Sequence, residues 1–103
     1  MNLADVEKLL GELEGVRRTG RNGLLPEWRY HGRLVARQLD SDHLVIRIDF
    51  DFRRLLMRND PATFSVPKRY VRHMMVVADF VLGDADAIAD VLENAWQLQR
   101  IAD

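Results

Sequence analysis

Three short runs of alternating apolar and polar residues in the middle of the chain constrain its fold more than any other feature. They occupy residues 28–30, 33–37 and 44–48. A period of two sends successive side chains to opposite sides of a strand, so each run predicts a half-buried β-strand. The connections, His31-Gly32 and Asp40-Ser41-Asp42, are rich in turn formers and too short for a crossover. We therefore predict an antiparallel meander.

The same alternation predicts that the two faces of this sheet differ in polarity. The predicted inner face is apolar and consists of Trp28, Tyr30, Leu34, Ala36, Leu44, Ile46 and Ile48. The predicted outer face consists of Arg29, His31, Arg33, Val35, Arg37, His43, Val45 and Arg47. Helices should cover the first face, and the second should present cations to solvent. An ordinary half-exposed sheet, with arginine stems lying over its backbone, would carry the same pattern.

The remaining segments predict the other elements of the fold. Apolar residues at helical spacing predict a first helix that begins after Asn2 and ends at Gly15, and a last helix after Gly83-Asp84. Asp49 should cap a helix over residues 50–59, with Phe52, Leu55 and Leu56 facing inward. Residues 63–66 and 74–78 predict strands, the second of them inside the sheet, whereas residues 16–26 and 68–70 are interpreted as loops. The predicted fold is a two-layer α+β domain, an antiparallel sheet with helices on one face, in the order α-β-β-β-α-β-β-α.

Length and composition favour a single cytoplasmic domain over residues 1–103. A chain of 103 residues can bury roughly 65% of its unfolded surface around one core. Cysteine is absent, which excludes disulfides and thiolate chemistry. No secretion signal is recognisable at the start, and no apolar run approaches the roughly 20 residues that span a bilayer, so we expect no membrane association.

Charge is divided unevenly along the chain although the net charge is only −1. Residues 17–72 hold 13 of the 15 basic side chains and carry a formal charge of +7. Residues 1–16 and 73–103 carry −3 and −5. If the two ends pack together, the molecule should have one acidic and one basic side.

This asymmetry makes a polyanion such as nucleic acid the predicted partner. Cationic side chains of the middle strands and of two basic loops would contact its phosphates. The candidate nucleic-acid-binding residues are Arg17, Arg18, Arg21, Arg29, Arg33, Arg37, Arg47, Lys68, Arg69 and Arg72. The arginines of residues 17–21 fit a solvated loop as well. A protein-interaction adaptor, binding a partner or a second copy, is the alternative function.

No pattern predicts catalysis, a metal or a cofactor. His31, His43 and His73 lack the spacing of a metal-binding motif. Asp49 and Asp51 are explained by helix capping. Gly20-Arg21-Asn22-Gly23 has neither the lysine nor the following helix of a phosphate-binding loop. We therefore predict a protein that is not an enzyme.

Several segments resemble the MmcQ/YjbR-like family of small bacterial proteins. The similar segments are residues 13–16 (Leu-Glu-Gly-Val), 30–36 (Tyr-His-Gly-Arg-Leu-Val-Ala) and 61–67 (Pro-Ala-Thr-Phe-Ser-Val-Pro), followed by Tyr70 and Ala95-Trp96. The resemblance implies a secretion-chaperone-like two-layer fold and a DNA-binding or regulatory role. Met74 and Met75 depart from it, since many members have a proline and an aromatic residue there, and the sequence ends without the basic tail that many members carry.

Overall fold

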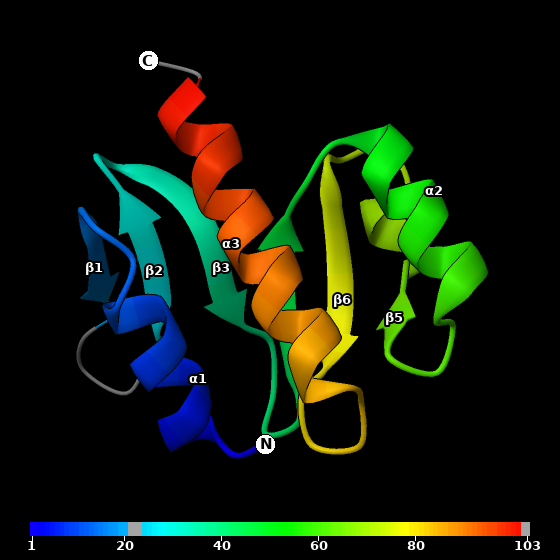
Figure 1. Ribbon diagram of the computed structural model, residues 1–103, viewed down its shortest axis with the longest axis horizontal. Helices are drawn as coiled ribbons and strands as arrows, with labels where there is room; N and C mark the ends of the chain where they lie inside the picture. Colours follow the sequence, from blue (N-terminus) through cyan, green and yellow to red (C-terminus); the bar gives the residue numbers. More distant parts are fainter. Residues whose placement is uncertain (21–23, 102–103) are drawn as a thin grey trace.

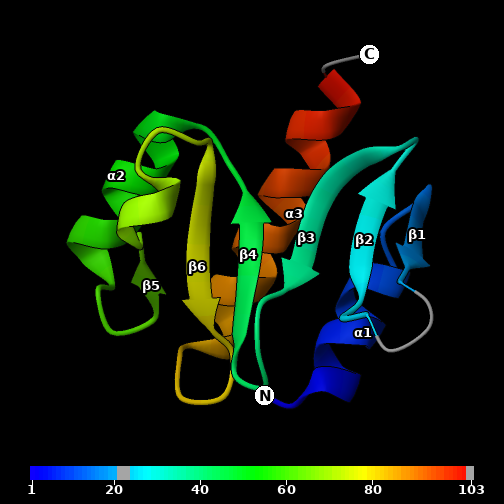
Figure 2. The same cartoon turned by 180° about the vertical axis from the view of Figure 1, so that it is seen from behind.

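A six-stranded antiparallel sheet, in the order β1-β2-β3-β4-β6-β5, forms one layer of the molecule. The computed structural model describes residues 1–20 and 24–101. Its elements are α1 (Leu3–Gly11), β1 (Val16–Thr19), β2 (Glu27–Tyr30), β3 (Arg33–Gln38), β4 (His43–Arg47), α2 (Phe50–Asn59), β5 (Phe64–Ser65), the 3-10 helix η1 (Lys68–Tyr70), β6 (Met75–Asp79) and α3 (Ala85–Ile101). The three α-helices lie on one side of the sheet (Figure 1), and the other side is turned towards the viewer in Figure 2. The predicted α+β class and the order of the predicted elements are confirmed.

The main core lies between the sheet and the helices. Its fully buried side chains come from α1 (Val6, Leu10), the strands (Trp28, Val35, Ala36, Leu44, Ile46, Phe64, Val76, Ala78), the segments that follow β4 and β6 (Ile48, Phe80) and α3 (Ile88, Val91, Leu92, Ala95). Burying one such aliphatic side chain is worth about 1.5–3 kcal/mol of transfer free energy, so this layer holds the fold together. None of the helices within residues 1–20 and 24–101 has the length and apolarity needed to cross a membrane.

A two-residue turn joins β2 to β3 and fixes the register of this hairpin. His31 and Gly32 have φ angles of 47° and 84°, as in a type I′ turn. Glycine tolerates this conformation without strain, and type I′ turns match the twist of the flanking strands. The predicted hairpins β2–β3 and β3–β4 are both confirmed.

One strand was not predicted. Residues 16–26 were interpreted as a loop, but Val16–Thr19 forms the edge strand β1 and pairs with β2 from Val16↔Tyr30 to Thr19↔Glu27. The local sequence, with two adjacent arginines, has no alternation that would predict a strand. The segment becomes a strand because its backbone forms hydrogen bonds with β2. The loop interpretation is therefore wrong for the first four residues of that segment, and residues 21–23 lie outside the described part.

The predicted N-caps of the helices are observed, but the predicted end of the first helix and the predicted inner side of the second differ from the structure. The side chain of Asn2 accepts a hydrogen bond from the backbone N–H of Asp5 at 2.9 Å, and α1 ends at Gly11, earlier than predicted. The Asp49 side chain caps α2 as expected, but Leu55 was wrongly placed inside and is 50% exposed. No residue of the fully described helix α2 is completely buried. Its partly buried Phe52, Leu56 and Met57 pack against the main core, so apolar as well as polar contacts hold the helix in place.

The segment between α2 and α3 differs in detail from the prediction. The expected strand over residues 63–66 is reduced to the two residues of β5, and the expected loop 68–70 is η1. Strand β6 lies between β4 and β5, which confirms that it is inside the sheet. Because η1 packs on the sheet side opposite the helices, it brings basic side chains to that side.

Candidate anion-binding face

A bulge in β3 decides which arginines reach the outer face of the sheet. Trp28 pairs with Ala36, but Arg29 pairs with Leu34, so Val35 is an extra residue in the β3 strand. An inserted residue reverses the alternation beyond it. Val35 joins the main core with Ala36, Leu34 lies with Arg29 on the outer face, and Arg33 points towards the helices. The predicted faces of these three β3 residues, Arg33, Leu34 and Val35, are therefore wrong.

Two of the candidate arginines bind groups of the helices instead of facing outward. Arg33 Nη2 donates to the backbone oxygen of Gln99 at 2.9 Å, in the last turn of α3. A cation there is favoured by the helix dipole. Arg18 lies opposite the core residue Trp28, and its Nε is 3.0 Å from Oε1 of Glu7 in α1. Arg18 thus connects the edge strand β1 to α1, and Arg33 connects the inner strand β3 to α3.

Four arginines on four consecutive strands do lie on the outer face. The pairing places Arg17 (β1), Arg29 (β2) and Arg37 (β3) there, and Arg47 (β4) shares this side with Val45. Arg17 stands directly opposite Arg29, a pairing of like charges that destabilises a sheet. Glu27 partly offsets it, with Oε1 3.0 Å from both Nε and Nη2 of Arg29.

The η1 helix adds cations next to this row. Tyr70 is buried against Val45 and Val77 in a small second core on the outer face. Arg37 donates a hydrogen bond to the Tyr70 hydroxyl. The guanidinium carbon of Arg37 lies 5.8 Å from the centre of the Tyr70 ring, and that of Arg69 lies 4.9 Å from it. Two guanidinium groups are therefore held against one phenol ring.

We call this set of cations the basic face: Arg17, Arg29, Arg37 and Arg47 on the strands, with Lys68 and Arg69 on η1. Arg72 is exposed in the turn that follows η1. Within residues 1–20 and 24–101, only Arg29 of the basic face has a carboxylate at ion-pair distance, and Arg72 has none. Of the ten candidates, seven thus belong to or adjoin the basic face, two point to the helices, and Arg21 lies outside the described residues.

Arg53 has a structural role that no sequence pattern predicts. Its Nη1 donates to the backbone oxygens of Tyr70 (3.2 Å), His73 (2.8 Å) and Met75 (3.2 Å), and its Nη2 donates to that of Val71 (2.9 Å). This side chain therefore fixes the path from η1 to β6. Backbone carbonyls have no sequence signature, so nothing in the residue pattern marks this contact.

His43 lies between two carboxylates. His43 Nδ1 lies 2.8 Å from Oδ1 of Asp40, and its Nε2 lies 3.9 Å from Oδ2 of Asp79. The backbone N–H of Asp42, and next the His43 side chain, lower the pKa of Asp40 because both favour the carboxylate. In the part of the chain that the structure describes, no three His, Asp or Glu side chains are grouped so that they could hold a metal ion.

A cleft of about 610 Å³ opens beside Arg37. Exposed Leu24 and Leu25 form an apolar wall, and Glu27, Arg37 and Gln38 supply polar groups. The cleft therefore extends the basic face towards the end of β1 with a surface that is apolar on one side.

The chain matches no family model, no curated protein and no solved structure. Its resemblance to the MmcQ/YjbR-like family stays a prediction. The function must therefore be argued from the geometry and charge of the surfaces described above.

Proposed function

We propose that this protein binds the phosphate backbone of nucleic acid, DNA first, through the basic face, and that it acts in the bacterial cytoplasm as a DNA-binding or regulatory protein. One observation carries the proposal. Cations from four adjacent strands and η1 share the outer face, and all but Arg29 lack a carboxylate partner in the described residues. Four neighbouring strands span about 14 Å, so the charges act together on a chain of phosphates.

The electrostatic repulsion between the arginines of the basic face supports a binding role. Arg17 and Arg29 repel each other across the β1–β2 pair, and Arg37 and Arg69 both lie against the Tyr70 ring. Repulsion between such groups falls when phosphates lie between them. A face that only needed to be soluble would gain stability from mixed charges.

The geometry favours contacts to phosphates rather than to base edges. The only helix that contributes to the basic face in the described residues is η1, with three residues. Among the described residues, no element on this face has the length of a recognition helix, and arginines on the surface of a sheet reach backbone oxygens without entering a groove. The family resemblance agrees with this proposal, because its members are commonly labelled DNA-binding.

A salt titration of DNA binding tests the proposal. We expect a fluorescently labelled duplex to bind at low salt, with an affinity that falls steeply as salt is added. The triple variant Arg17→Ala/Arg47→Ala/Arg69→Ala should reduce the slope of log K against log salt by about 3, since about 0.9 counterions are released per phosphate contact. Its affinity at low salt should fall by about tenfold or more.

The matched control removes the same charge from other surfaces. Arg54 and Arg58 are exposed on α2 and Arg100 is exposed on α3, so Arg54→Ala/Arg58→Ala/Arg100→Ala changes net charge equally. Binding by this control should stay within about twofold of the unaltered protein. Equal losses in both triple variants, or no binding at low salt, would refute the proposal.

A further inference from the structure

A groove between α1 and α3, on the side of the molecule opposite the basic face, is separate from the proposed nucleic-acid site. Two hollows of about 370 and 380 Å³ join there and share Leu9, Glu12 and Ala89 in their walls. The two helices make few direct contacts with each other. Both pack on the sheet, so the space between them remains open. We call it the α1–α3 groove.

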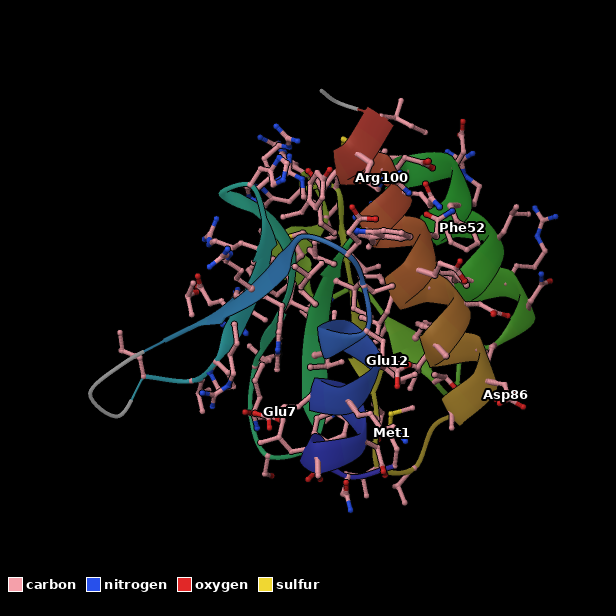
Figure 3. The ribbon with its side chains drawn as sticks, turned by 60° about the vertical axis from the view of Figure 1, so that its left-hand side comes forward. Met1, Glu7, Glu12, Phe52, Asp86 and Arg100 are labelled. Carbon is pink, nitrogen blue, oxygen red and sulfur yellow. The ribbon has the colours of Figure 1, made fainter. Side chains whose placement is uncertain are left out.

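The floor of the groove is apolar and its rims are acidic. Leu9, Leu13, Leu92 and Trp96 line the floor, and Ala85 and Ala89 leave room along α3. The acidic residues of the rims are Asp5, Glu12, Asp90 and Glu93. Lys8 is the one basic side chain among the described residues that line it. Figure 3 shows Met1 and Glu12 on the side of α1 that faces α3, with Glu7 on the opposite side.

Three of the four carboxylates on the rims are available to a partner. Asp5 is engaged in the capping box at the start of α1. Within residues 1–20 and 24–101, Glu12, Asp90 and Glu93 have no cation at ion-pair distance. An apolar floor between unpaired carboxylates is complementary to a segment with apolar residues on one side and lysine or arginine on its flanks.

We propose that the α1–α3 groove binds a basic amphipathic helix of a partner protein. From Ala85 to Trp96 the α3 wall is about 16 Å long at 1.5 Å per residue, the length of three helical turns. The small side chains of Ala85 and Ala89 allow a helix to approach α3 closely, as in helix-in-groove recognition. Nucleic acid does not fit this site because its phosphates would meet four carboxylates. The inference does not depend on the basic face.

A model peptide tests the groove directly. The probe is a 14-residue peptide of two Leu-Lys-Lys-Leu-Leu-Lys-Leu repeats, and its counterpart has glutamate in place of lysine. Nuclear magnetic resonance titration of the full chain should show shifts at Leu9, Ala89 and Trp96 with the lysine peptide and none with the glutamate peptide. Shifts on β1–β3 instead, or no binding at millimolar peptide, would overturn the proposal.

Paired charge reversals distinguish binding in the groove from non-specific attraction of the basic peptide to acidic residues elsewhere on the surface. Glu12→Lys/Glu93→Lys reverses two exposed groove residues, and Asp42→Lys/Asp51→Lys reverses two exposed residues that do not line the groove. The lysine peptide should bind the first variant at least about tenfold more weakly and the second within about twofold of the unaltered protein. Equal weakening would overturn the proposal. Sedimentation could instead show that the protein is a dimer without peptide and that Glu12→Lys/Glu93→Lys alone makes it a monomer. That result would assign the groove to a second copy of the chain and would also overturn the proposal.

Discussion

Replacing Arg53 with methionine should destabilise the protein much more than the loss of an ordinary helix-surface arginine. The guanidinium group donates to four backbone oxygens between residues 70 and 75 and lies 4.8 Å above the Phe50 ring. Nη1 has two hydrogens for three of these oxygens, so about three good hydrogen bonds are formed. Hydrogen bonds to a charged group are worth about 1.5–3 kcal/mol each, and less where water can replace them. Because Arg53 is only half-buried, we expect a total loss of about 2–3 kcal/mol.

Urea and thermal unfolding measure this loss. A decrease of that size should lower Tm by about 10–20 °C in a domain of this length. Arg54→Met is the matched control, since Arg54 is exposed and, among the described residues, the Asp51 carboxylate at 3.2 Å is the only hydrogen-bond or ion-pair partner of its guanidinium group. Its free energy of unfolding should change by no more than about 0.5 kcal/mol. Arg53→Lys should be intermediate, because an ammonium group cannot reproduce the planar fork. A loss in Arg53→Met below about 1 kcal/mol, or equal to that in Arg54→Met, would show that these contacts do not hold η1 in place.

Two further changes test the local geometry of the turns. Gly15→Ala should lower the free energy of unfolding by about 1–3 kcal/mol, because Gly15 has φ +79° and an added Cβ would lie 2.7 Å from a ring carbon of Tyr30. A denaturation curve like that of the unaltered protein would contradict this. The lowered pKa of Asp40 predicts that its contribution to stability is present above the unfolded-state pKa of about 3.9 and is lost as the pH falls through the lower folded-state pKa. Asp40→Asn should therefore reduce stability near neutral pH and lose this effect in strong acid, and a carboxyl titration midpoint at or above 3.9 would refute the assignment.

The sequence predicts most of this fold because local signals and burial agree along most of the chain. The period of two in β4 and the helical spacing in α3 correspond to the buried side chains of those elements. Asn2 and Asp49 cap α1 and α2 as their residue types indicate, and the His31-Gly32 turn closes its hairpin. Each of these features is determined by residues close together in the sequence, so pattern analysis can find it.

The candidate site was less predictable because it depends on register. One extra residue, Val35, sends Arg33 to the helix side and Leu34 to the outer face, although the sequence of β3 alternates without a visible break. Burial of Val35 in the main core is a tertiary effect that favours the bulge. Arg53 was missed for a related reason, because its four acceptors are backbone oxygens about 20 residues away.

The contacts of Arg18 and Arg33 explain how a charge difference along the chain becomes a difference between two sides of the molecule. The acidic ends of the chain supply α1 and α3 on one side, and the basic middle supplies η1 and most of the strands on the other, while α2, which also comes from the basic middle, lies on the helix side. Arg18 and Arg33 are the strand cations that cross to the helix side, and each finds an oxygen acceptor there, on Glu7 and Gln99. Among the described residues, Glu27 is the only carboxylate at ion-pair distance from an outer-face arginine of β1–β4. Sheet pairing therefore satisfies the cations that reach the helices and leaves a surplus of positive charge on the outer side, where a polyanion can approach without meeting α1 or α3.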